Sequence, residues 1–217
     1  MVISALPSTS TGPDGVTRCW WSDSDDLYRR YHDLEWGRPL ADDRLLFEKL
    51  SLDGFQAGLS WLTILRKREN FRTAFRAFEP SAVALFSSRD ITRLMNDVGI
   101  VRNRAKIEAT LNNARRMRDL VQEFGSFAAY VWQFEPKQRR RLLSRSELVE
   151  IVSSVESKAM SKDLRKRGWR FVGPTTVYSF IQAVGLVNDH VRGCAVAADV
   201  EKTRRAFIRP ELKRNET

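Results

Sequence analysis

Two cysteines and two histidines, the only ones among the 217 residues, lie in two stretches at opposite ends of the chain. His190 and Cys194 are four positions apart, which places both side chains on one face of a helical turn. Cys19 and His32 can reach them if the segment between these two residues folds back. Two thiols and two imidazoles suit tetrahedral zinc in a closed structural site. Such a site would tie the N-terminal segment to the C-terminal one.

Other interpretations of these residues stay open, because C-x₁₂-H followed by H-x₃-C is not a standard zinc-finger spacing. The cysteines can be small buried hydrophobes, and the histidines ordinary hydrogen-bonded side chains. A disulfide between Cys19 and Cys194 is conceivable, but an intracellular compartment would keep both thiols reduced.

Tryptophan, tyrosine and acidic residues are dense in "CWWSDSDDLYRRYHDLEWG" at 19–37 and "SLDGFQAGLSW" at 51–61. Aromatic faces can stack on a planar base and hold a cation, and a carboxylate among them can accept a hydrogen bond from the same cationic base. Aromatic density at helical spacing is also typical of a protein core. The two segments therefore predict either a ligand pocket or part of the core.

A glycine-centred turn at 95–106, "MNDVGIVRNRAK", joins two amphipathic segments. Arg102, Arg104 and Lys106 follow its Gly99. Such a turn can aim backbone N–H groups and a helix N-terminus at a phosphate without reading base sequence. A plain helix–helix connection with a solvated basic start explains the same residues.

The chain is strongly basic, with 37 Lys and Arg against 27 Asp and Glu and a formal net charge of +10. This field attracts polyanions, nucleic acid first and anionic membrane surfaces second. No apolar run approaches the roughly 18–20 residues of a membrane helix, and the N-terminus has no signal-peptide pattern. We therefore expect a cytosolic protein with no membrane partner.

Helical periodicity dominates the body of the chain and predicts an all-α fold. Helices are expected at 43–56 behind Asp42, at 61–78 behind Ser60, at 91–98 behind Asp90 with Gly99 just after its end, and at 107–124, 127–134, 157–167 and 174–184, the last with Pro174 in its first turn. Residues 135–146 are expected to form an exposed basic connection. The composition predicts a mobile tail at 1–17, one body at 18–195, and a basic tail at 196–217 that frays after residue 200.

Several long blocks resemble one family: "RCWW", "LYRRYHDLEWG", "LDGFQAGLSWLTILRKREN", "VGIVRNRAKIEATLNNAR" and "KRGWRFVGPTTVYSFIQAVGLVNDHVRGC". They are similar to the bacterial 3-methyladenine DNA glycosylase I family of the helix–hairpin–helix glycosylase superfamily. The resemblance covers about 18–195 and is weakest at 135–156. It implies a monomeric, two-lobed helical enzyme that removes 3-methyladenine from double-stranded alkylated DNA by hydrolysis, without a lyase step.

The resemblance also implies roles for individual residues. A structural zinc ion would be held by Cys19, His32, His190 and Cys194. Trp21, Tyr28, Tyr31 and Trp61 would line the base pocket, with Trp61 stacking on the flipped base, and Asp53, Trp61 and Tyr31 would form its catalytic centre. Gln56, Gly58 and Leu59 would lie at the gap that the base leaves in the duplex, and the turn at 98–106, with Gly99, Arg102, Arg104 and Lys106, would hold the DNA backbone.

Asp53 departs from the family pattern, because members usually carry glutamate there to hydrogen-bond the excised base. One methylene fewer withdraws the carboxylate by about 1.5 Å, enough to break a direct hydrogen bond. A bridging water or a small helix shift could restore the contact, and a solvent-facing Asp53 with no role is the alternative. We expect retained activity with an altered rate or base preference. No residue is identified as the general base.

Two other functions fit part of this pattern. With Asp53 too short for catalysis, the same zinc-bearing fold would recognise damaged or bent DNA without excising a base. A protein that binds RNA or single strands through stacking aromatics fits the charge and the tryptophan content, but leaves the turn at 98–106 without a purpose.

Overall fold

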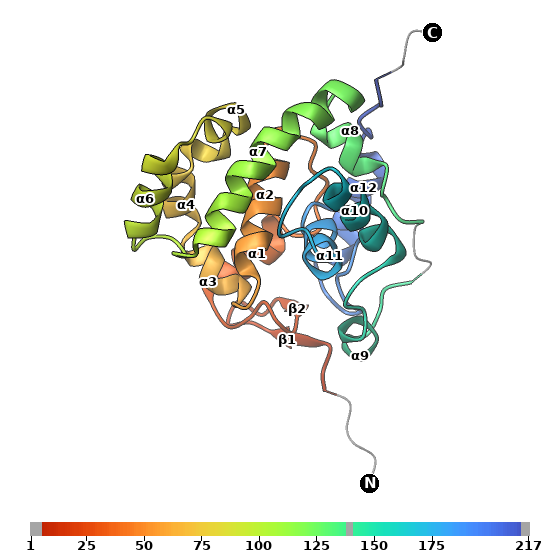
Figure 1. Ribbon diagram of the computed structural model, residues 1–217. Coiled ribbons are helices and arrows are strands. Elements are labelled where there is room, and N and C mark those ends of the chain that lie inside the picture. Colours follow the sequence, from red (N-terminus) through yellow and green to blue (C-terminus); the bar gives the residue numbers. More distant parts are fainter. Residues whose placement is uncertain (1–5, 138–140, 214–217) are drawn as a thin grey trace.

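The computed structural model describes residues 6–137 and 141–213, and most of these residues lie in helices (Figure 1). Two short antiparallel strands come first, β1 Thr9–Thr11 and β2 Thr17–Cys19. The helices in chain order are α1 Asp26–Leu34, α2 Asp43–Gln56, α3 Trp61–Arg66, α4 Arg68–Ala74, η1 Arg76–Phe78, α5 Pro80–Ala84, α6 Ser88–Asn96, α7 Arg104–Phe124, α8 Phe127–Trp132, α9 Arg145–Val149, α10 Val155–Lys166, α11 Pro174–Ala183 and α12 Ala197–Ala206. In the part of the chain so described, no helix is long and apolar enough to cross a membrane.

The helices form two groups with α2 and α7 between them (Figure 1). Helices α4, α5 and α6 lie on one side, and α10, α11 and α12 lie on the other. Helix α2 packs against α3, α7, α8, η1 and α11, so it contacts α11 of one group and η1, which links α4 to α5 of the other. Its side chains Leu46, Phe47, Leu52 and Phe55 are fully buried. A polar side chain carried by this helix therefore lies at the junction of the two groups.

Three predicted helix starts are confirmed. Asp42 caps α2, because its Oδ1 accepts a hydrogen bond from the Leu45 N–H at 2.8 Å. Ser60 caps α3 in the same way, accepting from the Thr63 N–H at 3.2 Å. Pro174 lies in the first turn of α11, where its missing N–H leaves no bond unmade. These starts depend on local chemistry, which explains why spacing predicts them.

The prediction of one unbroken helix from the start of α3 to residue 78 is wrong. Lys67, with φ −96° and ψ 0°, separates α3 from α4. Arg76, Ala77 and Phe78 then have φ of 53–56°, a left-handed conformation that is uncommon outside glycine. This turn places Phe78 in the core, with its ring stacked 5.3 Å from that of Phe75.

The start and end of α6 also differ from the prediction. Ser87, rather than Asp90, is the N-cap, and the two side chains form a capping box in which Asp90 accepts from the Ser87 N–H at 2.9 Å. The helix ends at Asn96 with Asp97 as its C-cap. Gly99 is not left-handed. A Cβ at Gly99 would lie 2.9 Å from Asp97 Oδ1, so close approach explains the glycine.

The N-terminal prediction of a mobile tail is wrong from Thr9 onward. Strands β1 and β2 pair with Thr9 opposite Cys19. The Ala195 N–H donates to the carbonyl of Thr17 at 2.9 Å, so this hairpin lies against the C-terminal segment. Residues 1–5 of that tail lie outside the described residues.

The C-terminal tail does not fray after residue 200, because α12 continues to Ala206. Arg204 is 6% exposed and donates to the carbonyls of Gly185 and Leu186, both at 2.8 Å. These bonds fix α12 on the loop that follows α11. Residues 214–217, and 138–140 of the predicted basic connection, lie outside the described part.

Candidate functional site

A cavity of about 330 Å³ lies where α1, α2, α3 and α11 meet. Its aromatic residues are Trp20, Trp21, Tyr28, Tyr31, Trp36 and Trp61. Its polar residues are Asp53, Gln56, Ser179 and Gln182. The volume is at the lower end of the range for small-molecule sites, and an aromatic wall with few polar groups is typical of them. The aromatic segments at 19–37 and 51–61 thus form a pocket as well as core.

Asp53 reaches this cavity from α2. It is 5% exposed, so the alternative of a solvent-facing helix residue is wrong. Its Oδ2 has no hydrogen-bond partner among the described residues. Burial raises the pKa of Asp53 to about 7, with the charge of Lys49 opposing the rise. A buried, unpartnered carboxyl beside aromatic faces can receive a cationic planar ligand, offsetting its charge and accepting its hydrogen bond.

Four of the predicted aromatics stand next to one another along the cavity wall. The ring centroids of Trp21 and Tyr28 are 4.9 Å apart, those of Tyr28 and Tyr31 are 6.5 Å apart, and those of Tyr31 and Trp61 are 5.4 Å apart. Helix α1 presents Tyr28 and Tyr31 one turn apart on one face. The Nε1 of Trp61 is buried without a partner in the described part of the structure. The wall therefore offers ring faces and an unused donor.

The turn between α2 and α3 projects an apolar side chain beside the cavity. Gln56, which lines the cavity, ends α2, and the Leu59 N–H donates to its carbonyl at 2.6 Å. Gly58 has a φ of 80°, which a larger residue would adopt only with strain. Leu59 is 43% exposed. An exposed leucine on a tight turn has the form of a wedge that fills a gap between stacked bases.

Lys106, which the resemblance implies as a DNA contact, is turned into the protein in this structure. It is 8% exposed. Its ammonium donates to the carbonyl of Phe55 at 2.8 Å and to that of Ala57 at 2.5 Å. Both carbonyls lie at the C-terminal end of α2, where they lack partners within the helix. Lys106 therefore holds the end of α2 and the turn that follows it.

The turn at 97–103 offers other groups to a polyanion. The Gly99 N–H donates to Asp97 Oδ1 at 2.8 Å, so it is not free. Among the described residues, the N–H groups of Val101 and Arg102 have no hydrogen-bond partner. Arg102 and Arg104 are exposed. Free N–H groups and exposed guanidinium groups together suit phosphate binding.

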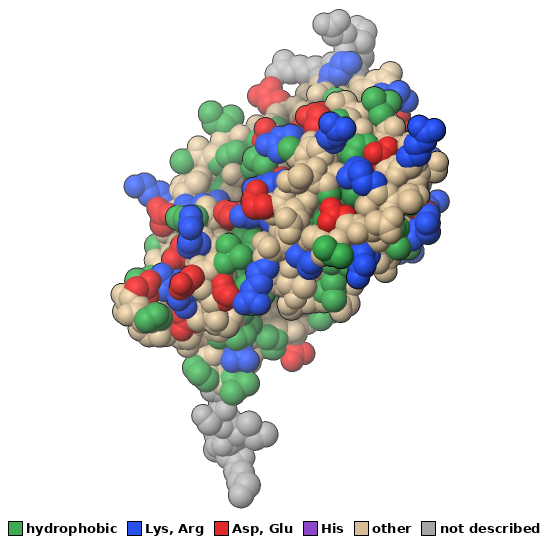
Figure 2. Space-filling view, turned by 90° about the vertical axis from the view of Figure 1, so that its left-hand side faces the viewer, with side chains coloured by type: hydrophobic (Ala, Val, Ile, Leu, Met, Phe, Trp, Pro, Cys, Tyr) green, Lys and Arg blue, Asp and Glu red, His purple; other side chains and the backbone are tan. Residues whose placement is uncertain are grey.

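The positive charge of the chain does not form one continuous field on the face that carries α4, α5 and α6. Figure 2 shows Lys and Arg side chains interspersed there with Asp and Glu and with small hydrophobic patches. Several of the arginines are paired, such as Arg72 with Glu69 at 2.8 Å and Arg93 with Asp90 at 3.4 Å. The net charge alone therefore does not locate a nucleic-acid interface. The cavity and the turns beside it are better indicators of where such an interface would lie.

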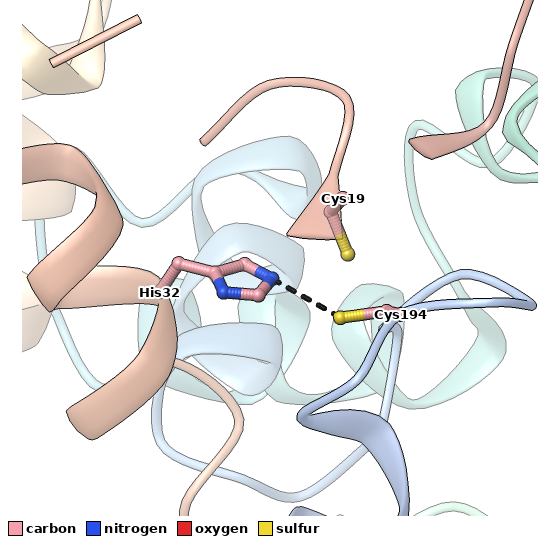
Figure 3. Close-up of side chains that lie close together, drawn as sticks. All are labelled: Cys19, His32 and Cys194. Carbon is pink, nitrogen blue, oxygen red and sulfur yellow. Dashed lines mark hydrogen bonds between the residues drawn. The ribbon is translucent and has the colours of Figure 1, made fainter. Parts of the chain in front are cut away.

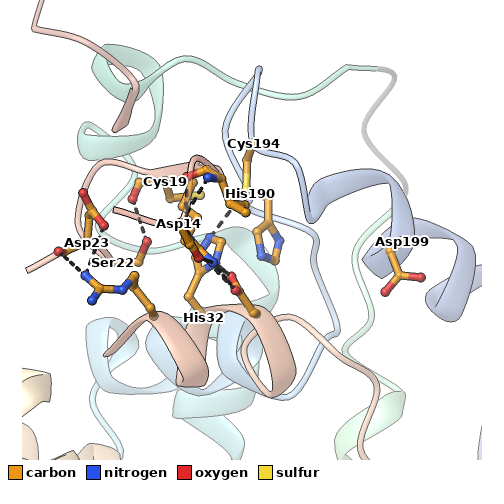
Figure 4. Close-up of polar contacts among 12 residues, drawn as sticks. Asp14, Cys19, Ser22, Asp23, His32, His190, Cys194 and Asp199 are labelled. Carbon is orange, nitrogen blue, oxygen red and sulfur yellow. Dashed lines mark hydrogen bonds and ion pairs between the residues drawn. The ribbon is translucent and has the colours of Figure 1, made fainter. Parts of the chain in front are cut away.

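Both cysteines and His32, from the two ends of the chain, lie close together (Figure 3). Ligand atoms of Cys19, His32 and Cys194 lie within 4.8 Å of one another, all three buried. The Nε2 of His32 is 3.5 Å from Cys194 Sγ. His190 lies beside this cluster (Figure 4), its ring centroid 4.8 Å from that of His32. The Nε2 of His190 is buried and has no partner in the described part of the chain.

Neighbouring side chains orient the two imidazoles. The Nδ1 of His32 is 2.7 Å from Asp33 Oδ1, and Asp33 is in turn held by the buried Arg18 at 2.8 Å. The Nδ1 of His190 is 2.9 Å from Asn188 Oδ1. In both residues Nδ1 is thus occupied, which leaves Nε2 as the ligand atom, the arrangement that metal-binding histidines use.

The ionisation of these residues also suits a metal. Contact with Cys19, and then with His32, lowers the pKa of Cys194, which favours its thiolate. The same contact, together with burial, raises the pKa of Cys19, because two adjacent thiolates repel each other. Burial lowers the pKa of His190 to about 4 and keeps that imidazole neutral. A cation between the two sulfurs would remove their repulsion, and both thiols are free.

Comparison with known proteins shows the family of the chain. A family model described as methyladenine glycosylase matches residues 20–197. The chain belongs to the methyladenine glycosylase family. DNA-3-methyladenine glycosylase 1 of Escherichia coli (strain K12) is 49% identical over 180 residues, which are 82% of this chain and 96% of that protein.

Solved structures of the family have the same fold. The crystal structure of a 3-methyladenine DNA glycosylase I has a TM-score of 0.78 and 47% identity, with 82% of this chain and 98% of that chain covered. A variant of such a glycosylase in complex with 3-methyladenine has a TM-score of 0.76 and 40% identity, covering 80% of this chain and 94% of that chain. The chain therefore has the mostly helical fold of these relatives, and the prediction of an all-α chain is wrong at the hairpin of β1 and β2.

Sequence reasoning missed several residues of the cavity. Trp20 and Trp36 lie in the dense aromatic segment and could have been included on that ground. Lys49 was also missed; it lies outside the cavity, four residues before Asp53 on α2, a spacing that places both on one face. Ser179 and Gln182 reach the cavity from α11, and no local pattern marks them.

Proposed function

We propose that this protein is a DNA repair enzyme that hydrolyses the N-glycosidic bond of 3-methyladenine in alkylated DNA, without cleaving the strand. The observation that carries the proposal is the Asp53 carboxyl, buried and without a hydrogen-bond partner for Oδ2 among the described residues, on the wall of an aromatic cavity. Family membership supports it, as do the name of the Escherichia coli relative and the 3-methyladenine bound in a related structure.

For hydrolysis of this glycosidic bond, the main task of the protein would be to select the methylated base. Methylation at N3 gives adenine a positive charge and makes it a good leaving group, so no strong acid is needed to protonate it. Tyr31 and Trp61 would hold the cationic base by stacking and cation–π attraction. The Asp53 carboxylate would accept its hydrogen bond and offset its charge. These contacts, made after the base leaves the duplex, would offset the few kcal/mol that flipping costs.

The substrate in this proposal is double-stranded DNA, bound by a monomer. Leu59 would enter the space that the flipped base vacates, with Gln56 and Gly58 beside it. Arg102 and Arg104, with the backbone N–H groups of the same turn, would contact phosphates. The cavity and both flanking turns belong to one chain, so a second copy would not be required.

The same proposal includes one structural zinc ion bound by Cys19, His32, His190 and Cys194. Three of their ligand atoms lie within 4.8 Å of one another, and the fourth residue has a buried Nε2 without a partner among the described residues. Zinc would cross-link the N-terminal hairpin, α1 and the segment before α12 and so stabilise the fold. It would take no part in the reaction.

Asp53 favours one alternative, because a carboxylate on a shorter side chain reaches less far into the cavity. A protein of the same fold could then prefer another cationic alkylpurine, or recognise damaged DNA without excising it. Release of free bases from N-methylated duplex DNA, identified by mass spectrometry, separates these outcomes. We expect 3-methyladenine from both the natural chain and Asp53→Glu. Release by Asp53→Glu alone would contradict the proposal and support the alternative.

A further inference from the structure

Lys49 contacts the aromatic wall of the base cavity from outside it. Its Nζ lies 2.5 Å from the Tyr31 hydroxyl oxygen and 4.0 Å from the ring centroid of Trp61. Lys49 lines a neighbouring cavity of about 330 Å³, between α1, α2 and α4, whereas Tyr31 lines both cavities. The Tyr31 side chain therefore separates the ammonium from the space that a base would occupy.

The charge of Lys49 acts on Asp53, which lies one turn further along the same helix. The two residues are four positions apart on α2, and Lys49 is the charged group that acts on Asp53 against the effect of burial. Other charged groups near Lys49 are paired across helices. Arg68 of α4 binds Glu35, which follows α1, at 2.9 Å, and Arg72 of α4 binds Glu48 of α2 at 2.7 Å.

The remaining neighbours contribute no further charge at neutral pH. Helix α1 brings the phenols of Tyr28 and Tyr31, whose pKa values burial raises. Helix α3 brings Trp61, and α11 brings Ser179 and Gln182, none of which titrates. Arg68 and Glu35 also line the cavity on the Lys49 side of Tyr31, but they pair with each other.

The hydrogen bond from Lys49 also fixes what Tyr31 can do. An ammonium can only donate, so the Tyr31 oxygen accepts this bond. Its own O–H is then left to donate, and no acceptor for it lies within hydrogen-bond distance in the described part of the chain. Because Tyr31 lines the base cavity on its other side, a ring nitrogen of a bound purine could accept that bond.

We propose that Lys49 is a positioning residue of the base cavity, which keeps the Asp53 carboxylate ionised near neutral pH and makes Tyr31 a hydrogen-bond donor toward the base. The inference rests on the proposed function, because it gives a role to the same cavity. The Lys49 cation remains over the rings of Tyr31 and Trp61, outside the base cavity, so a cationic base can take Asp53 as its partner without displacing it.

The pKa values give the sign of the effect. Burial raises the pKa of Asp53 to about 7, and burial lowers that of Lys49 to about 8. Between these values each group opposes the neutralisation of the other. Without the lysine charge, nothing opposes the effect of burial on Asp53. Its pKa therefore rises further, by about one pH unit.

The direct test is the titration of Asp53 by carbon-13 NMR of its carboxyl group in the full-length protein. We expect its midpoint to move up by about one pH unit in Lys49→Met and Lys49→Gln. It should stay in place in Lys49→Arg, which keeps the charge, and in Lys202→Met, which removes an exposed lysine from α12. An unchanged midpoint in both neutral variants would overturn the inference.

The second readout is the pH dependence of kcat/KM for 3-methyladenine release. Its acid limb should move up by the same interval in Lys49→Met, a loss of about tenfold at a pH below both midpoints. An active natural chain with an unmoved limb in Lys49→Met would overturn the role of Lys49. A natural chain that releases no base would refute the proposed function instead, and the NMR titration would still decide whether Lys49 controls Asp53.

Discussion

Replacing Lys106 with methionine separates a structural role for this residue from the DNA contact that the sequence predicts. The ammonium donates to the carbonyls of Phe55 and Ala57 at the end of α2. Phe55 is 1% exposed, so its carbonyl would lose its partner away from water, whereas Ala57 is exposed and can bind water instead. One unsatisfied buried carbonyl costs about 1–3 kcal/mol. We therefore predict that Lys106→Met lowers the free energy of unfolding by about 2 kcal/mol.

Urea unfolding followed by circular dichroism measures this loss. In a chain of this size it corresponds to a fall in Tm of about 4–8 °C. The salt dependence of binding to undamaged duplex should stay unchanged, because a buried ammonium displaces no counterion from DNA. Arg104→Met is the matched control, since Arg104 is exposed on the same turn of α7. It should reduce the salt slope by about one and change stability by less than about 0.5 kcal/mol.

The opposite pattern of stability and salt dependence would contradict a structural role for Lys106. Unaltered unfolding of Lys106→Met, combined with a salt slope lower by about one counterion, would mean that its ammonium leaves the α2 carbonyls and reaches a phosphate. Lys106 would then be a DNA contact, as the resemblance implies.

Three further predictions concern the cavity and the cysteine–histidine cluster. Release of 3-methyladenine should rise with pH through about 7, because burial raises the pKa of Asp53 to that value and the carboxylate is the working form; a flat profile from pH 5 to 8 would contradict this. Trp61→Ala should abolish release while leaving affinity for undamaged duplex nearly intact, and unchanged release would remove Trp61 from the site. Metal analysis should find one zinc per natural chain and less in His190→Ala, and none in the natural chain would exclude the zinc site.

Features that depend on local chemistry were accessible from the sequence. The caps at Asp42 and Ser60 and the proline that begins α11 need only neighbouring residues, and they were predicted correctly. The aromatic and acidic segments were recognised as either pocket or core, and the structure places them at a cavity with core behind it. The family blocks indicated which aromatics would come together there.

Features that depend on tertiary contacts could not be predicted from the sequence. Phe71, Phe75 and Phe78 keep a helical spacing although the chain turns left-handed between the last two, because all three must reach one core. A lysine in a basic turn reads as solvated, and nothing near Lys106 in sequence reveals that the end of α2 lies against it. The effect of Lys49 on Asp53 was equally difficult to predict, because it depends on the rings that α1 and α3 bring over the lysine.

The role of the Asp53 carboxylate can be tested by comparing the natural chain with Asp53→Asn at pH 8. The substrate is duplex DNA containing 3-methyladenine, and both the bound complex and the free base are followed. Asparagine keeps the shape of the side chain but cannot carry the negative charge. We expect rapid release of 3-methyladenine by the natural chain, and binding with greatly reduced release by the variant. Equal release by both proteins would contradict the claim that the Asp53 carboxylate selects the cationic base.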